Sequence, residues 1–295
     1  WFSVLGFAVL VLVLAVTGEA QVQPRFATAT VRPTQMGRDA RLVARVTEDG
    51  GYFATNVTLK RLLENAYARS GFDLREVAGG PEWLATDRFD ITATSAAGLI
   101  VDEDGFARHT LLMLQELLKE QFKLRAGVRE QFRAAYALVT TGGAGPQLQR
   151  SALDCAAVMR AFAKGERGGK LCGAAPYPGR LVATGLTMPD LAALVGRSLD
   201  RPVIDRTGLR GFFDVQLEGV EFRPEGPFGP SYRPSNTTRS VFEHIGPQLG
   251  LKLEPVTAPI EVLVIDHAER LREVNRSSRC AAYSGATATE RCARS

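Results

Sequence analysis

The sequence predicts an α+β fold: repeated helix–strand–strand units forming mostly antiparallel sheets, with helices packed on one face, in two similar halves. Three observations lead to this prediction. Four amphipathic helical stretches follow one another, each lies next to a threonine, and each is followed by two short strand-like runs. A helix with one apolar stripe must bury that stripe, and a sheet is the available partner.

Each predicted helix carries apolar residues at helical spacing. The stripes are Leu59, Leu62, Leu63, Ala66 and Tyr67; Leu111, Leu114, Leu118 and Phe122; Met188, Leu191, Leu194, Val195 and Leu199; and Phe242, Ile245 and Leu249. The neighbouring threonines are Thr58, Thr110, Thr187 and the pair Thr237-Thr238. A threonine hydroxyl at a helix start can accept a bond from a free first-turn N–H, so we expect these residues to be N-caps.

The predicted strands come in pairs after the helices. They lie at 72–74 and 89–92, 122–124 and 135–139, 202–204 and 212–217, and 251–253 and 260–265, after an opening strand at 26–31. Turn residues separate several pairs: Gly79-Gly80-Pro81, Thr207-Gly208 and Ala258-Pro259. Short alternating strands with such breakers are typical of β-hairpins, so we expect a hairpin after each helix.

Five segments follow from these patterns. Residues 1–20 are expected to be a signal peptide or N-terminal anchor, because the apolar run from Val4 to Val16 is short for a bilayer span and small residues follow it. Residues 21–145 form the first half and 179–270 the second, with two units each. Residues 146–178 are a Gly/Ala/Pro-rich connection, with a short helix expected at 154–164. Residues 271–295 are expected to be a disordered tail.

The cysteines and charges restrict the class of protein. Cys155 and Cys172 are near neighbours in the connection, which makes them a candidate disulfide in an exported protein. Whether Cys280 pairs with Cys292 stays open. The net charge is +4, and the segment from Arg270 onward carries a surplus of four positive charges. The rest of the chain is nearly balanced and lacks the basic excess of a nucleic-acid-binding face.

No motif in the chain predicts a catalytic, cofactor or metal site. His109, His244 and His267 are too far apart in sequence for a helical metal motif. A Gly-x-Ser-x-Gly elbow is absent, and the glycine runs lack the lysine of a phosphate-binding loop. The alternative is a hydrolase assembled from strand ends and turns, with Asp205, Asp214, Asp266 and His267 as its candidates.

Three residues near the first turn need separate interpretation. Trp83 follows Gly80-Pro81-Glu82, and we expect it to plug the core rather than form a ligand platform. Asp87 and Asp90 could be imagined as an acid–base pair. Strand alternation instead puts Asp90 on the solvent face, paired with Arg88 or another base.

Several motifs carry a family resemblance. They are Asn56-Val57-Thr58-Leu59-Lys60, Gly79-Gly80-Pro81-Glu82-Trp83-Leu84, Asp87-Arg88-Phe89-Asp90-Ile91, Gln121-Phe122-Lys123-Leu124, Arg201-Pro202-Val203-Ile204-Asp205-Arg206-Thr207-Gly208-Leu209 and Val262-Leu263-Val264-Ile265-Asp266-His267. In these motifs, over about 26–270, the chain resembles the soil-associated, acidobacterial family of exported proteins of unknown function, the DUF3738 type. Relatives in that family also form the extracytoplasmic part of membrane sensor-peptidase proteins.

The resemblance carries over no catalytic residue, because none is assigned in the family. The motif residues are therefore expected to be structural: Gly79, Gly80, Pro81, Trp83, Asp87, Phe89, Asp90, Pro202, Asp205, Thr207, Gly208, Asp214, Asp266 and His267. No catalytic, cofactor-binding or metal residue is expected.

The repeated units resemble a structural scaffold, and no set of polar side chains is expected to converge on one catalytic site. This favours a non-enzymatic binding or protein-interaction module. The expected location is exported, meaning periplasmic, secreted or anchored on the outer side of the membrane. Exposed sheet edges could accept a strand from an envelope protein or peptide. No nucleic-acid partner is expected, and membrane contact would run only through an uncleaved N-terminal segment. The alternatives are the hydrolase and an extracytoplasmic ligand-sensing domain with an apolar pocket near Trp83 or Phe213.

Overall fold

The computed structural model describes residues 24–37, 40–70, 73–103, 105–143, 145, 147–166, 172–177, 179–220 and 237–271. The side chains of 175–177 and 237–240 are also left undescribed. The predicted signal segment 1–20, the tail beyond Leu271 and its cysteines Cys280 and Cys292 lie outside these ranges.

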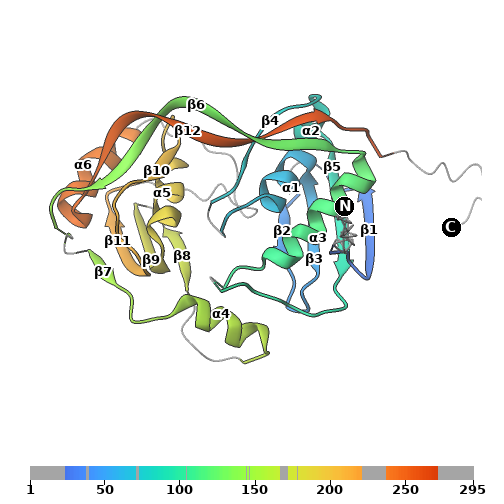
Figure 1. Cartoon of the computed structure of the whole chain (residues 1–295), viewed down its shortest axis with the longest axis horizontal. Coiled ribbons are helices and arrows are strands. Elements are labelled where there is room, and N and C mark those ends of the chain that lie inside the picture. The colour runs from blue at the N-terminus through green and yellow to red at the C-terminus, as the bar shows by residue number, and fades with distance from the viewer. Residues whose placement is uncertain are drawn as a thin grey trace, which may run out of the picture.

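Two lobes of similar construction face each other (Figure 1). The first lobe has a four-stranded sheet in the order β1 (Thr28–Pro33), β5 (Arg88–Thr94), β3 (Tyr52–Thr58), β2 (Val43–Val46), with α1 (Leu59–Ala66), α2 (Trp83–Thr86) and α3 (Arg108–Phe122). The second lobe has the order β7 (Leu148–Arg150), β11 (Phe213–Glu218), β9 (Arg180–Leu186), β8 (Gly173–Tyr177), with α5 (Met188–Gly196) and α6 (Thr237–Leu249). The α+β class with mostly antiparallel sheets is confirmed.

A third sheet joins the lobes. Its centre is an antiparallel ribbon of β6 (Arg125–Thr140) and β12 (Leu251–His267), which runs from one lobe to the other along the top of Figure 1. The short strand β10 (Val203–Asp205) pairs in parallel with the end of β6, and β4 (Glu76–Gly79) pairs in parallel with the end of β12. The first half therefore ends in β6, which pairs with β10 of the second half, and the second half ends in β12, which pairs with β4 of the first half.

The expected hairpin after each helix is wrong. The runs 251–253 and 260–265 belong to the single strand β12. The run 122–124 is not a strand, because Phe122 ends α3 and Lys123 caps it, and 135–139 lies in β6. The run 72–74 is not a strand at its described residues, 73 and 74, and the strand after α1 is β4, which begins at Glu76. β4 and β10 join the ribbon while β5 and β11 join the lobe sheets, so the strands after α1 and α5 do not form hairpins. The fourfold repeat of helix–hairpin units is therefore not confirmed.

Pro259 continues β12 rather than forming the expected turn. Its nitrogen, which has no hydrogen to donate, faces away from β6. Tyr136 donates its N–H to the Pro202 carbonyl of β10, whereas Thr141 donates to Gly250 at the start of β12. Backbone groups alternate sides along a strand, so even-numbered residues of β6 face the β10 side. Pro255 and Pro259 are in register with Tyr136 and Phe132, so both proline nitrogens face the outer edge, where a sheet tolerates them.

The threonine caps are confirmed at two helices. The Thr58 hydroxyl accepts a hydrogen bond from the backbone N–H of Arg61, and the Thr187 hydroxyl accepts one from the N–H of Asp190, each at 3.3 Å. Thr110 is not a cap, because α3 already begins at Arg108 and the buried Thr110 hydroxyl donates to the Gly50 carbonyl at 2.9 Å. The side chains of Thr237 and Thr238 lie outside the described residues.

A matching β-bulge precedes the capped helix in each lobe. Asn56 has a φ of 57° and donates its N–H to Asp90 at 3.0 Å, while Gly185 has a φ of 69° and donates to Asp214 at 3.0 Å. Left-handed backbone of this kind favours glycine and asparagine. Asp90 is thus half-buried rather than on the solvent face, because the bulge turns the Asn56 N–H toward it. It forms its ion pair with Arg32, at 3.9 Å, rather than with Arg88.

The expected connection 146–178 is partly built into the second lobe. It contributes the edge strands β7 and β8, and its predicted short helix is α4 (Cys155–Ala163), capped by Asp154. A disulfide joins Cys155 to Cys172, with their Cα atoms 5.7 Å apart. The disulfide fixes the start of α4 to the start of β8.

Each lobe has its own apolar core. The stripes of α1, α3 and α5 are buried as predicted, apart from the half-buried Tyr67 and Leu199. On α6 the expected Phe242 is 39% exposed, and Val241 is fully buried instead. Ile245 and Leu249 are buried as predicted, so only the first position of the stripe was wrong. Phe242 instead packs edge-on against the Tyr136 ring at 5.2 Å.

Burial of Tyr52 predicts alkaline sensitivity. The side chain lies in the first core, and burial raises its pKa from 10.0 to about 12. Between these values the unfolded chain loses the phenolic proton and the folded chain keeps it, so stability is lost as the pH rises through this window. Between about pH 9 and about pH 12, we expect the free energy of unfolding of the wild type to fall by about 3 kcal/mol more than that of Tyr52→Phe. Urea unfolding at each pH measures this difference. Parallel curves for the two proteins would contradict this assignment.

Candidate interlobe binding cleft

A cleft of about 1400 Å³ lies between the two lobes. Its walls come from 61–76 of the first lobe, 187–205 of the second, parts of both ribbon strands, and the disulfide. Small-molecule pockets in proteins usually measure about 300–1000 Å³. The cleft therefore has room for a ligand the size of a short peptide.

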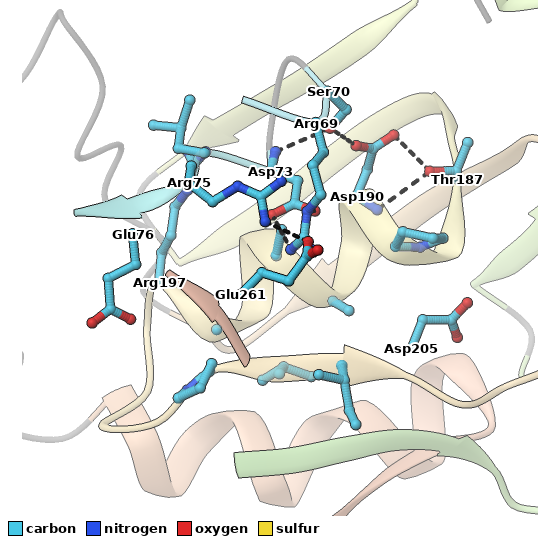
Figure 2. A pocket seen from close by; sticks show the side chains of 18 of the residues that line it. Arg69, Ser70, Asp73, Arg75, Glu76, Thr187, Asp190, Arg197, Asp205 and Glu261 are labelled. Carbon is cyan, nitrogen blue, oxygen red and sulfur yellow. Dashed lines mark hydrogen bonds and ion pairs between the residues drawn. The ribbon is translucent and has the colours of Figure 1, made fainter. Parts of the chain in front are cut away.

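Paired charges form the wall on the first-lobe side (Figure 2). The guanidinium groups of Arg69 and Arg75 both reach Glu261 of β12, and Arg69 also pairs with Asp73 at 2.6 Å. The hydrogen bond from Arg75 is the main reason why the pKa of Glu261 is lowered. These contacts tie the segment between α1 and β4 to the ribbon and stabilise the ionised form of the Glu261 carboxylate.

A second link crosses the cleft between the lobes. Asp190, in the first turn of α5, accepts a hydrogen bond from the Thr187 hydroxyl at 2.7 Å. Its other carboxylate oxygen accepts from the hydroxyl of Ser70 in the first lobe, as Figure 2 shows. Asp190 therefore serves both the start of its own helix and the contact between lobes.

The helix α4 also connects the lobes, on the side away from the ribbon (Figure 1). Arg160 of α4 donates to the carbonyl of Glu103 in the first lobe at 2.8 Å. Gly105 approaches Ala156 and Met159 so closely that a Cβ on the glycine would lie 2.9 Å from the Ala156 Cα. The cleft thus lies between the ribbon and this helix.

The four hydrolase candidates are not brought together. Asp205 lines the cleft but accepts bonds from the N–H and hydroxyl of Thr207 at 2.9 and 2.7 Å, within its own turn. Asp214 holds the Gly185 bulge. Asp266 pairs with Arg129 at 2.9 Å, and His267 lies 3.3 Å from Glu269. Among the described cleft residues, Asp205 is the only one of the four.

The other motif residues make packing and turn contacts. Trp83 is half-buried, with its ring 6.2 Å from Phe122 and the guanidinium of Arg270 5.7 Å from its centre. Asp87 pairs with Arg270 at 3.0 Å, and Phe89 meets Phe122 edge-on at 4.9 Å. The remaining motif positions end β4, start β10 or turn after it: Gly79, Gly80, Pro81, Pro202, Thr207 and Gly208. Neither Trp83 nor Phe213 lines this cleft, so it is not the apolar pocket between the halves that was expected beside them.

Sequence reasoning missed the residues that line the ribbon side of the cleft. Glu130 and Arg133 project from β6, and Arg133 pairs with Glu76 of β4 at 2.9 Å. The available signal was the stretch 125–134, in which most odd positions are polar and most even positions apolar, typical of a strand with one solvated face. The stretch lies between the strands predicted at 122–124 and 135–139.

The fold and the cleft define a two-lobed α+β protein whose lobes are bridged by a long strand ribbon. The chain belongs to DUF3738, a family of proteins of unknown function, whose profile matches residues 60–268. No curated protein and no solved structure matches it. Among the described residues there is no cluster of three metal-ligating side chains, and none of the described helices is long and apolar enough to span a bilayer.

Proposed function

We propose that this protein is an exported, non-enzymatic binding protein whose ligand occupies the interlobe cleft. The observation that carries the proposal is the cleft itself, which both lobes and the ribbon build together. Its volume suits a peptide-sized ligand better than a small metabolite. The described candidates for hydrolysis are used in turns, bulges and surface pairs, which favours binding over catalysis.

The charges of the cleft favour a ligand that carries both signs. The lining arginines and carboxylates are Arg61, Arg69, Arg75, Arg133, Arg197, Arg201, Glu64, Asp73, Glu76, Glu130, Asp190, Asp200, Asp205 and Glu261. A peptide segment has donors, acceptors and side chains of either charge to match such walls. A peptide or a segment of an envelope protein therefore fits better than a purely anionic ligand.

Export is supported by the disulfide and by the family resemblance. Disulfides persist in oxidising compartments outside the cytoplasm, and the Cys155–Cys172 bond is compatible with that location. A fusion of the natural full-length protein to alkaline phosphatase, which is active only after export, tests this part. An inactive but intact fusion would contradict export.

A ligand-sensing role is the second candidate. Its support is that described contacts between the lobes include single hydrogen bonds, such as Ser70 to Asp190 and Arg160 to Glu103. A ligand that touches both lobes would then change their separation. Small-angle scattering with a bound peptide distinguishes the roles: a smaller radius of gyration supports sensing, and an unchanged one supports simple binding.

The cleft is tested by filling it. Ala193 is half-buried on α5 and lines the cleft, so Ala193→Trp should occupy ligand space. Leu112→Trp is the control, because Leu112 is 41% exposed on α3 and does not line the cleft. We expect peptides selected from a defined library on wild type to lose binding to Ala193→Trp and to keep it with Leu112→Trp. Ligands that bind both variants equally, or that wild type cleaves, would overturn the proposal.

A further inference from the structure

We infer that β6 accepts an extended peptide as an added strand along its open edge, residues 126–134. This inference rests on the proposed function, because Glu130 of that edge lines the cleft. It goes further by naming the mode of binding and the chemistry of the peptide.

The edge is open because β10 covers only one end of β6. The pairing with β10 extends over Tyr136, Ala137 and Leu138. By alternation the N–H and C=O groups of residues 126, 128, 130, 132 and 134 point to the same side as those of Tyr136. No backbone partner for them occurs in the part of the chain that the structure describes. Such unpaired groups are a template for another strand.

The two edges of the ribbon differ in a way that favours β6. The outer edge of β12 contains Pro255 and Pro259, whose nitrogens face outward and have no hydrogen to donate. Proline at outward positions is one of the ways in which proteins prevent strand addition. The corresponding stretch of β6 contains no proline. The ribbon therefore blocks one edge and leaves the other able to pair.

The side chains along the open edge specify the partner. Val128 is 44% exposed and Phe132 is 74% exposed, and they are the large exposed apolar side chains that lie in a described strand. Between them lies Glu130, which is exposed and forms no ion pair with any described residue. Opposite neighbours in a sheet interact, so the added strand should carry two apolar residues with a lysine or arginine midway between them.

A second copy of this chain fits the edge less well than such a peptide. Two β6 edges can pair antiparallel around a two-fold axis. The register that places Val128 of one copy opposite Phe132 of the other also places Glu130 opposite Glu130. Like charges directly opposite in a sheet are destabilising.

The test uses fluorescein-labelled octapeptides on the full chain, followed by fluorescence anisotropy. The probe has threonine at most positions, with valine, lysine and phenylalanine at the second, fourth and sixth. A second peptide has glutamate in place of lysine, and a third has a methyl group on the lysine backbone nitrogen. Wild type should prefer the lysine peptide, Glu130→Lys should prefer the glutamate peptide, and the N-methyl peptide should bind at least about tenfold more weakly.

A matched pair of proline variants tests the edge itself. Ala134 and Thr257 lie directly opposite each other in the ribbon, and both direct their backbone groups outward. Ala134→Pro removes one N–H from the open edge of β6, while Thr257→Pro removes one from the edge already blocked by proline. We expect Ala134→Pro to weaken the lysine peptide about tenfold or more and Thr257→Pro to change its affinity less than about twofold.

The outcomes separate this inference from the proposed function. The inference is overturned if the lysine peptide does not bind wild type, if Ala134→Pro binds it normally, or if Glu130→Lys does not reverse the charge preference. If peptides selected from the library still lose binding to Ala193→Trp, the cleft proposal would stand. Peptide binding that responds to Ala134→Pro but not to Ala193→Trp would support strand addition and contradict the cleft proposal. A wild-type dimer that Ala134→Pro dissociates in sedimentation would identify a second copy as the occupant and overturn the inference.

Discussion

Replacing Gly185 with alanine is expected to destabilise the second lobe by about 4 kcal/mol and to leave Cys155 and Cys172 unpaired. A Cβ at Gly185 would lie 1.9 Å from the Cys155 sulfur and 3.0 Å from the Cys172 sulfur. The disulfide and the new methyl group therefore cannot occupy the same space. Loss of the disulfide, with its sequence separation of 17, accounts for about 3 kcal/mol, and the left-handed backbone for about 1 kcal/mol.

Gly208→Ala is the matched control for this substitution. Gly208 has the same φ of 69°, and nothing lies within 4 Å of a Cβ placed there. Gly208→Ala should lower the free energy of unfolding by about 1 kcal/mol, from backbone strain alone. Urea unfolding gives the free energies, and thiol titration in denaturant counts the free cysteines. Equal losses in the two variants, or an intact Cys155–Cys172 bond in Gly185→Ala, would show that the close approach has been misjudged.

Phe122→Ala should remove about 3–5 kcal/mol from the stability of the first lobe. Phe122 is fully buried at the end of α3, and its ring meets Phe89 and Trp83 at 4.9 and 6.2 Å. Truncation loses the burial of the ring and leaves a cavity, because close-packed neighbours relax only partly. The loss of the edge-on contact with Phe89 adds to this cost.

Phe132→Ala provides the same chemical change at an exposed site. Phe132 is 74% exposed in β6, so its truncation should change the free energy of unfolding by less than about 0.5 kcal/mol. Thermal and urea unfolding of both variants, followed by circular dichroism, measure the difference. A large loss in Phe132→Ala would mean that its ring stabilises the fold, and would weaken its assignment as a binding residue.

The pairing of strands could not be predicted from the sequence. Local alternation predicts strands at 89–92 and 212–217, within or close to β5 and β11, but it does not say which strand lies beside them. In the structure β5 and β11 pair with β3 and β9, two strands that the sequence reasoning missed. Both lie directly before a capped helix and contain a bulge, which interrupts the alternation that identifies a strand.

The candidate site could be predicted even less. Its walls come from Arg69, Arg75, Glu130, Asp190 and Glu261, which lie in segments far apart in sequence. Each is an ordinary surface charge when considered alone. Their relation depends on how the ribbon positions the lobes, and no local pattern encodes that arrangement.

The sequence by itself determined the features that depend on neighbouring residues. These include the helical stripes, the caps at Thr58 and Thr187, the short helix α4 and the pairing of Cys155 with Cys172. The tertiary structure alone decided what Pro259 does. A proline ends a strand or continues it according to which side its nitrogen faces, and only the position of β6 determines that side. The same pairing created the long ribbon, the cleft beneath it and the open edge of β6.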